Sequence, residues 1–514
     1  MCRESRWTVL GTLGVLWLVG LLAWTGRATA ASGTLEKSYG GVLRKIYVIP
    51  RSPIGVPWEI VGISVNAATP ALEPLVRVDK NGRVYPWLAE RWTVLPDQNT
   101  VLFRLRRGVR FHDGTDFNAH AAKWNLDRQM EARTVPVSSV EVVDEHTIRV
   151  RLAEYNNIWP TIFGGTRALM ISPTASTRNG LEWARWNPVG TGPFRIVRYE
   201  RDVQAIYRKF DGYWQAGKPY LDGVEYLFLV NSETRKAAFL SGQANFLGAT
   251  FQAAAELAQT SRNRYNFLAD WSFYNVLVPS SANPDSPFRD PRVRAAVSHA
   301  LDRDALVRGL TYGYGAPAYQ AVFPDQQGYL RNWQGKRYDP RRARELLAQA
   351  GFPQGFRTRL ISTDATEREQ LVAIQRYLHQ VGIQAEIEQV PSARYQEYIN
   401  RGWEGLLYQP FARFPTVNEF VRQYWFLNQR FASFERPEGF EGVWRQSLRT
   451  PVPSPQFAER LNRMLIERDH LVPVFYYKTI LVTTKEVRDT GYFRWYTTAW
   501  WSPEEAWMAR EERR

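Results

Sequence analysis

The feature that most constrains the fold of this chain is a repeated switch between two hydrophobic periods. Residues 147–152 alternate apolar and polar side chains, as a half-buried strand does, whereas residues 119–130 carry apolar side chains at helical spacing. The other predicted helices cover residues 290–309, 340–350 and 367–381, and the other predicted strands cover residues 101–105, 194–199, 383–387, 403–408 and 472–483. Strands that alternate with helices predict an α/β protein with largely buried sheets.

The composition excludes several classes of protein. Hydrophobic residues make up 44% of the 514, enough to form a core, which excludes an intrinsically disordered chain. The only cysteine is Cys2, so neither a disulfide framework nor a thiolate metal cluster is expected. The six histidines show no metal-ligand spacing, and we predict no metal, no cofactor and no catalytic residue.

The charge balance is strongly basic, with 66 Lys and Arg against 51 Asp and Glu. The basic residues are spread from end to end and form no patch, so no nucleic-acid partner is expected. We interpret the net charge of +15 as an Arg-rich, solvated surface. Two alternatives stay open: some Arg side chains line a site for an anionic ligand, or they hold the protein near anionic lipid head groups.

The N-terminal residues have the pattern of an export signal. Arg3 and Arg6 precede an apolar run over residues 8–24, and the small residues Ala28 and Ala30 follow it. We therefore expect a signal peptide over residues 1–30, with an uncleaved membrane anchor as the alternative. Because the rest of the sequence has no second apolar run of this length, a polytopic membrane protein is excluded. The body is expected on the periplasmic or extracellular side of the cell envelope.

A dense cluster of turn formers covers residues 188–194. Gly190 and Gly192 flank Thr191, which predicts a backbone that bends sharply or approaches another segment closely. The cluster is not a phosphate-binding loop, because it lacks the Lys-Ser/Thr ending and the following helix.

Several ordered motifs together give the chain a family resemblance. Residues 86–92 (PWLAERW), 103–115 (FRLRRGVRFHDGT), 189–194 (VGTGPF) and 288–296 (FRDPRVRAA) resemble the motifs of family 5 extracellular solute-binding proteins. These proteins are the oligopeptide-, dipeptide- and nickel-binding components of ABC importers. The resemblance runs from about Gly41 to the end of the sequence, and the order and spacing of the motifs make it specific.

The resemblance implies an α/β, two-lobed periplasmic-binding-protein-like fold (type II, cluster C) with an extra domain inserted in lobe I. It also implies a monomer that captures a small solute between two closing lobes and delivers it to the permease subunits of an ABC importer. The expected segments are lobe I over residues 35–75, the inserted domain over 76–189, lobe I again over 190–280, lobe II over 281–484, and a lobe I segment with an aromatic tail over 485–514.

The resemblance also indicates where a solute is held. In peptide-binding members, an Asp that follows a strand of lobe II pairs with the α-ammonium group of the peptide, and Arg413 falls at that position here. A guanidinium repels an ammonium but binds a carboxylate or phosphate, which predicts an anionic or polar non-peptide solute in place of an oligopeptide. The alternatives are a misplaced gap, or an Arg413 that is paired internally with Glu404 or Glu419.

Six further residues are candidates for lining the site because they lie on or next to the same predicted strands, or just before the helix that leads to one of them. Trp271, Tyr274 and Asn275 belong to a strand that the resemblance places at the cleft and hinge, and core positions are the alternative for them. The remaining candidates are Tyr408, Phe411 and Arg394. Two other functions stay open, an extracellular hydrolase and a membrane-anchored scaffold or chaperone that uses the same fold.

Overall fold

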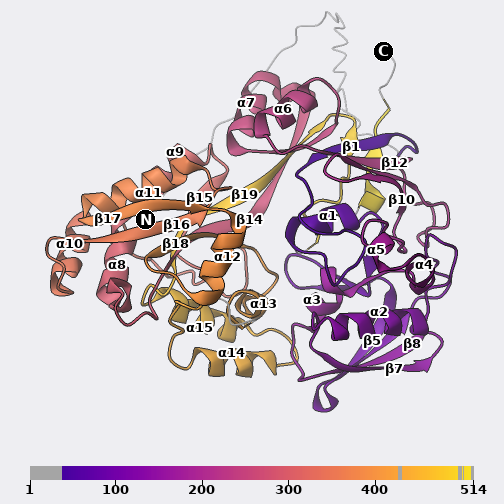
Figure 1. The fold of residues 1–514 in the computed structure, drawn as a ribbon, viewed down its shortest axis with the longest axis horizontal. Helices are drawn as coiled ribbons and strands as arrows, with labels where there is room; N and C mark the ends of the chain where they lie inside the picture. The colour runs from indigo at the N-terminus through magenta and orange to yellow at the C-terminus, as the bar shows by residue number, and fades with distance from the viewer. Residues whose placement is uncertain (1–36, 427–430, 496–500, 502, 511–514) are drawn as a thin grey trace, which may run out of the picture. The chain divides into compact units, whose positions relative to one another are not determined.

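The computed structural model describes residues 37–426, 431–495, 501 and 503–510 (Figure 1). The predicted signal peptide over residues 1–30 lies outside the described residues, as do Tyr496 and Trp500 of the predicted aromatic tail. Within the described part of the chain, no helix has the length and apolar character needed to span a membrane.

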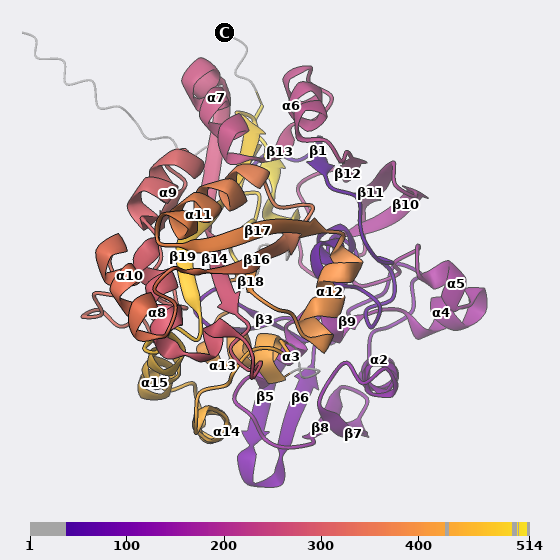
Figure 2. The same cartoon turned by 60° about the vertical axis from the view of Figure 1, so that its left-hand side comes forward.

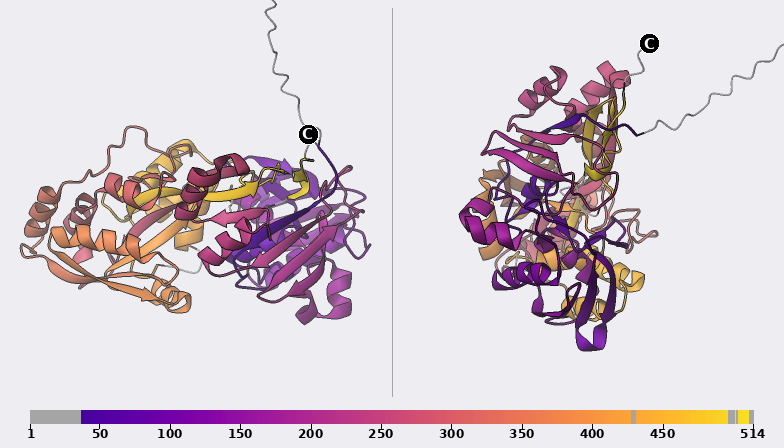
Figure 3. Two further views of the ribbon diagram at one scale, coloured as in Figure 1. Left: turned by 90° about the horizontal axis from the view of Figure 1, so that it is seen from above. Right: turned by 90° about the vertical axis from the view of Figure 1, so that its right-hand side faces the viewer.

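The main sheet has eleven strands, and two of them run through both of its halves. β14 (Tyr265–Pro279) and β19 (Val472–Thr484) pair antiparallel from Tyr265 opposite Thr484 to Leu277 opposite Val472. In one half, β19 pairs with β13, and in the other half, β14 pairs with β18. The two long strands therefore connect the halves, as Figures 1 and 3 show.

The other strands of this sheet follow in the order β10-β11-β12-β1-β13 on the β19 side and β18-β16-β17 on the β14 side, with β15 paired to β19. Their bounds are β1 Val42–Tyr47, β10 Phe194–Glu200, β11 Gln204–Lys209, β12 Gly223–Phe228, β13 Phe246–Ala249, β15 Gly315–Pro317, β16 Phe356–Thr363, β17 Ile383–Val390 and β18 Leu406–Ala412.

Helices cover both faces of the β18-β16-β17 half of the sheet (Figure 2). One face packs against α8 (Pro291–Ala300), α9 (Arg303–Leu310), α10 (Pro340–Gln349) and α11 (Arg368–Gln380). The other face packs against α12 (Ser392–Arg401), α13 (Val417–Val421), α14 (Phe440–Leu448) and α15 (Pro455–Ile466).

The single helix predicted over residues 290–309 is wrong, because the structure has two helices there. Leu301 has extended backbone angles after α8, and the Asp302 side chain accepts a hydrogen bond from the Ala305 N–H at 2.9 Å. Asp302 thus caps a new helix, α9, as an N-terminal Asp commonly does.

A second, four-stranded sheet lies within the residues expected to form the inserted domain. Its order is β5 (Ala89–Leu95), β6 (Thr100–Leu105), β8 (Thr147–Leu152) and β7 (Val137–Asp144), and α2 (Ala119–Glu131) packs on it. The strands predicted over residues 101–105 and 147–152 and the helix over 119–130 are confirmed.

The shorter elements around these sheets are α1 Val65–Ala68, β2 Glu73–Pro74, β3 Val76–Val78, β4 Val84–Pro86, α3 Trp159–Phe163, β9 Leu169–Met170, α4 Pro173–Asn179, α5 Leu181–Ala184, α6 Ser232–Leu240, α7 Phe251–Ser261, β20 Val487–Arg488 and β21 Trp507–Met508.

The glycine pair at residues 190 and 192 lies against another segment, as predicted. The Gly192 N–H donates to the Ala71 carbonyl at 2.9 Å, and a Cβ on Gly190 would lie only 2.1 Å from that same oxygen. Thr191 between them donates its hydroxyl to the buried Glu73 carboxylate at 2.8 Å. The close approach of the backbones thus fixes Thr191 against Glu73.

Glu73 is a fully buried acceptor for four donors from three segments of the chain. Besides Thr191, its oxygens accept from Trp87 Nε1 at 2.8 Å, the Tyr213 hydroxyl at 2.9 Å and Trp214 Nε1 at 2.9 Å. This carboxylate therefore joins its own segment to three others in the first half of the molecule, which is built on β1 and β10–β13.

The segment from residue 485 onward returns to the first half and packs there. Trp501 is fully buried, and its ring centroid lies 5.7 Å from that of Phe246 on β13. The buried Lys45 of β1 lies 4.4 Å from the Trp501 ring and donates to the Tyr492 hydroxyl at 3.1 Å and to Asn66 Oδ1 at 2.6 Å. Burial holds the pKa of Lys45 well below its usual value.

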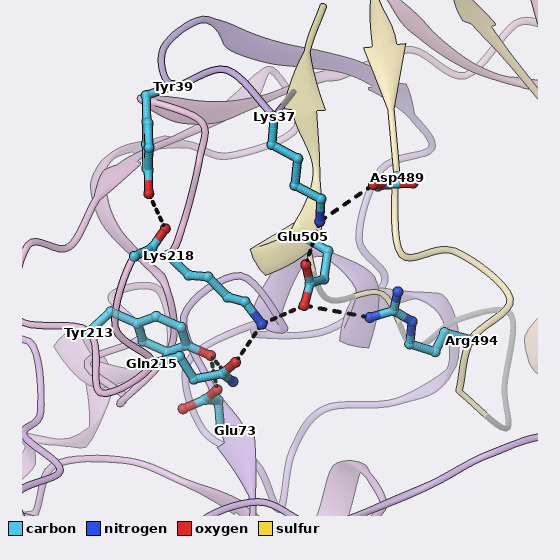
Figure 4. Close-up of polar contacts among 10 residues, drawn as sticks. Lys37, Tyr39, Glu73, Tyr213, Gln215, Lys218, Asp489, Arg494 and Glu505 are labelled. Carbon is cyan, nitrogen blue, oxygen red and sulfur yellow. Dashed lines mark hydrogen bonds and ion pairs between the residues drawn. The ribbon is translucent and has the colours of Figure 1, made fainter. Parts of the chain in front are cut away.

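Ion pairs at Glu505 reinforce the same attachment (Figure 4). Its carboxylate contacts Lys37 at 3.0 Å, Arg494 at 3.9 Å and the ammonium of Lys218. The three cations come from the start, the middle and the end of the described chain, so Glu505 ties together segments that are far apart in sequence.

Candidate functional site

The candidate site lies where β14 and β18 run side by side. β18 begins at Leu406 and continues through Pro410 to Ala412, so the strand predicted over residues 403–408 is placed too early. Gly405 explains the late start, because its φ of +98° is not an extended strand conformation. Pro410 is tolerated because β16 pairs with β18 only at Leu406 and Leu407.

The pleat of the strands separates four of the sequence-predicted candidates into two groups. Tyr274 and Phe411 lie opposite each other, with ring centroids 5.7 Å apart, in the core that faces α12–α15. Asn275 and Tyr408 lie on the other face, where both donate to Gln370 Oε1 of α11, at 3.2 and 2.8 Å. The structure therefore does not bring Asn275 and Tyr408 together with Tyr274.

Arg413 directly follows β18, and its N–H donates to the Ser272 carbonyl of β14 at 2.7 Å. The residue is only 5% exposed. Its Nη1 donates to both carboxylate oxygens of Asp325, at 2.9 and 3.0 Å, and its guanidinium lies 5.4 Å from the Phe323 ring centroid. Arg413 is thus buried, charged and paired with a residue of a loop 88 positions earlier in the chain.

The sequence-based alternative that pairs Arg413 with Glu404 or Glu419 is wrong. Glu419 forms its ion pair with Arg422 at 2.8 Å, and Glu404 lies 3.9 Å from Arg359. Asp325 could not be found from the sequence, because it occupies an irregular segment between β15 and α10 with no periodic pattern around it.

The buried end of Arg413 faces a small cavity with unused hydrogen-bonding groups. Arg413 Nε, Arg413 Nη2 and the Tyr274 hydroxyl have no hydrogen-bond partner among the described residues. All three belong to residues that line one cavity of about 10 Å³, together with Phe323 and Gln326. Such a volume holds about one water molecule, so it is too small for a carboxylate in this form. Burial raises the pKa of Tyr274 well above its usual value, which keeps its hydroxyl a neutral donor.

Trp271 directly precedes Ser272, the backbone partner of Arg413, and is half-buried on β14. Lys478 of β19 places its ammonium 4.8 Å from the Trp271 ring, and Asp270 pairs with Lys80 at 2.7 Å. Sequence reasoning missed Lys80, Asp270 and Lys478. The only available signal was the position of Asp270 next to Trp271 in the sequence.

Lys80 comes from a turn that lies directly against the segment after Arg413. A Cβ on Gly82 of this turn would lie 3.5 Å from Thr416 Cγ2. The turn belongs to the β3–β4 hairpin of the first half, whereas Arg413 and Thr416 belong to the second half. Lys80, Trp271 and Arg413 therefore mark a boundary to which both halves contribute charged or aromatic side chains.

Arg394 does not share this boundary. It lies exposed on α12, pairs with Glu397 of the same helix at 2.6 Å and lies 4.7 Å from the Tyr398 ring. Among the described residues, no group of three or more His, Cys, Asp or Glu side chains is arranged to hold a metal ion.

Two lobes joined by a pair of long strands, with charged and aromatic groups at their boundary, define a solute-binding protein of the two-lobed α/β class. The family model of bacterial extracellular solute-binding proteins, family 5 (middle part), matches residues 83–430. The chain belongs to this family, as the motifs predicted.

The relatives share about a third of their residues with this chain. Glutathione-binding protein GsiB of Salmonella choleraesuis is 34% identical over 336 residues, which cover 63% of this chain and 65% of that protein. GsiB of Shigella flexneri is 33% identical over 335 residues, with the same coverage. The chain thus matches just under two thirds of the length of these curated relatives.

Solved structures show the same fold at low sequence identity. The periplasmic binding protein DppA of Helicobacter pylori, in complex with the peptide STSA, has a TM-score of 0.78 at 22% identity and covers 92% of this chain and 99% of its own. The dipeptide-binding protein of Pseudoalteromonas sp. SM9913, in complex with Met-Leu, has a TM-score of 0.78 at 20% identity, over 90% and 100%. The predicted two-lobed α/β fold is confirmed, whereas the inserted domain and the segment boundaries stay predictions.

Proposed function

We propose that this chain is the solute-capturing component of an ABC importer on the periplasmic or extracellular side of the membrane. Membership of family 5 and the two-lobed fold support this proposal. A solute enters between the lobes, contacts from both lobes stabilise the closed form, and the closed form docks on the permease. An export signal over residues 1–30, cleaved or kept as an anchor, completes the proposal.

We assign the solute's anionic end to Arg413. The observation that carries this assignment is that the Arg413 side chain is only 4% exposed, yet its Nε and Nη2 have no partner among the described residues, and Arg413 lines a cavity together with Tyr274. These three donors suit a carboxylate, because charge-assisted bonds to Arg are strong and directional. Trp271 then supplies an aromatic wall next to this anchor, and Lys80 supplies a contact from the other lobe.

The proposed solute is a peptide-sized acid. Relatives that are about a third identical are named for glutathione, which carries two carboxylates and one ammonium group. A glutathione-like solute reconciles a peptide-binding fold with an Arg at the anchor, because a carboxylate can occupy Arg413 without any ammonium nearby. Family relatives that bind solutes also argue against the hydrolase and scaffold alternatives.

The test is a set of binding isotherms for glutathione and for its analogue with both carboxylates amidated. The Arg413→Gln variant should bind glutathione about 30-fold more weakly than wild type, because it loses charge-assisted hydrogen bonds worth about 2 kcal/mol. Arg394→Gln is the matched control and should bind like wild type, since Arg394 is exposed on α12. Equal affinity of wild type and Arg413→Gln for every bound solute would overturn the anchor.

Two further readouts separate capture from catalysis and identify the solute. Mass spectrometry of the material that co-purifies with the protein should recover an intact acid, whereas cleavage products would favour the hydrolase. Recovery only of solutes that lack a carboxylate would contradict the carboxylate anchor.

A further inference from the structure

A turn of the chain covers the buried guanidinium from outside. Phe323 lies against the Arg413 guanidinium, Asp325 takes both hydrogen bonds of Nη1, and Gln326 Nε2 donates to the Phe414 carbonyl. Phe323, Gln326 and Arg413 also line the same 10 Å³ cavity. The turn over residues 323–326 is therefore the outer wall of the proposed anchor.

The two members of the ion pair differ sharply in exposure. The Arg413 side chain is 4% exposed, whereas the Asp325 side chain is 46% exposed. A buried guanidinium without a counter-ion costs several kcal/mol, so Arg413 needs a carboxylate in every state of the protein. The Asp325 side chain, in contrast, is already half-exposed to water. When it leaves Arg413, its carboxylate becomes fully hydrated at a small cost in free energy.

We propose that Asp325 is an internal substitute for the carboxylate of the solute. It neutralises Arg413 in the empty protein, and the solute's carboxylate replaces it when the turn over residues 323–326 moves outward. This inference rests on the proposed function, since it concerns the same anchor. It adds that the solute must bring a carboxylate of its own and must compete with one built into the chain.

Geometry supports an exchange over simple addition. Nε and Nη2 form the free edge of the guanidinium, which is the edge that binds a carboxylate through two parallel hydrogen bonds. The cavity that Arg413 lines holds about one water and cannot admit a carboxylate while the turn is in place. The turn is held by the Phe323 ring, the Asp325 ion pair and the Gln326 hydrogen bond, so displacing it breaks the Asp325 contact as well.

The direct test is chemical rescue with formate, the smallest carboxylate. In Asp325→Ala, sodium formate should raise the melting temperature by about 3 °C or more over sodium chloride of equal concentration, because formate takes the vacated position beside Arg413. Wild type should show no difference between the two salts. Asp285→Ala is the matched control, since Asp285 is exposed and has no ion pair among the described residues.

The double variant Asp325→Ala with Arg413→Gln decides whether formate acts at Arg413. It should show no formate effect. A formate effect that persists in the double variant, or an effect in Asp325→Ala no larger than that in wild type, would overturn the inference. Asp325→Asn provides a second test with less change in shape: it should bind glutathione at least about 5-fold more tightly than wild type, because the competing carboxylate is gone.

These outcomes distinguish failure of the inference from failure of the proposed function. If Arg413→Gln weakens glutathione binding but Asp325→Asn does not strengthen it, the anchor stands and the exchange is wrong. If Arg413→Gln leaves solute binding unchanged, the anchor itself is wrong, and formate rescue then marks only a structural ion pair.

Discussion

The side-chain amide of Asn418 donates a hydrogen bond to the side-chain oxygen of Asn157 at 3.1 Å, between residues 261 positions apart. Asn157 follows β8 of the four-stranded sheet, and Asn418 lies on α13 of the second lobe. Asn157 Nδ2 in turn donates to the Ser447 carbonyl at 2.7 Å and to Thr450 Oγ1 at 3.0 Å. Because Asn157 is buried, this junction is a satisfied polar network between the two parts of the molecule.

Replacing Asn157 with Ala should lower the free energy of unfolding by about 3 kcal/mol, since the Asn418 amide and the Ser447 carbonyl lose their partner in a buried place. Urea unfolding followed by tryptophan fluorescence measures the change. Asn156→Ala, one residue away, is the control and should cost clearly less, because Asn156 is only half-buried and bonds within its own turn. Equal losses of unfolding free energy in the two variants would show that the buried network contributes no more stability than the hydrogen bond of Asn156.

Gly190→Ala should destabilise the protein by more than about 2 kcal/mol, because the new methyl group would lie on the Ala71 carbonyl and force two backbones apart. Gly309→Ala is the control: its Cβ meets nothing within 4 Å, and it replaces Gly within helix α9. This control should be neutral or stabilising by about 0.5 kcal/mol. Thermal unfolding of the three proteins side by side tests both expectations, and an unchanged Gly190→Ala would contradict the close approach.

Glu73→Gln should destabilise the protein by about 3 kcal/mol, although it barely changes the shape of the side chain. The amide group of Gln is a donor and would face two of the four donors that now point at the carboxylate. Chemical unfolding provides the measurement, with Glu131→Gln at the exposed end of α2 as a control that should stay within about 0.5 kcal/mol of wild type. If Glu73→Gln had the same unfolding midpoint as wild type, one side-chain oxygen would be enough to satisfy all four donors.

The half-buried His112 should make the protein sensitive to acid. Desolvation lowers the pKa of His112 to about 4, and its Nε2 lies 2.9 Å from the Gly192 carbonyl. The unfolded chain binds a proton near pH 6.5, so the stability that neutral His112 contributes is complete above that pH and is lost as the pH falls toward 4. The total loss is about 3 kcal/mol.

Urea unfolding between pH 7 and pH 4 should therefore show a shallower fall in stability for His112→Gln than for wild type. His120→Gln, on the exposed side of α2, should follow the wild-type slope. A His112 ring that titrates near pH 6.5 in an NMR experiment would refute this expectation.

The parts of the fold that local patterns determine could be predicted from the sequence. The strand over residues 147–152 and the helix over residues 119–130 appear within one residue of their predicted bounds. The buried face of each segment sets the spacing of its apolar residues, so the segment's own sequence is enough to predict it. The helix break at Leu301 was missed even though Asp302, a good helix cap, was visible. There the apolar pattern runs on across the break, and only the local hydrogen bond of Asp302 shows the new start.

The site could be predicted only where it depends on one residue's place along a strand. Arg413 became a candidate because the resemblance places it where peptide-binding members have an Asp after a strand of lobe II, and its role in binding stays a prediction. Asp325, which neutralises it, and Lys80, which pairs with Asp270 at a distance of 190 residues, leave no local signal. Ion pairs between distant loops depend on how the sheet brings its ends together, which a single sequence does not encode in any short pattern.

The contact between Lys45 and Tyr492 spans 447 residues, and it sets the order in which the first lobe is completed. A ribosome delivers β1 long before it delivers Tyr492 and Trp501, the rings that enclose the Lys45 ammonium. Until then, the Lys45 ammonium has beside it only the rings of Tyr47, Tyr226 and Phe246. The first lobe therefore acquires its full set of contacts around Lys45 only after the segment that carries Tyr492 and Trp501 has been added.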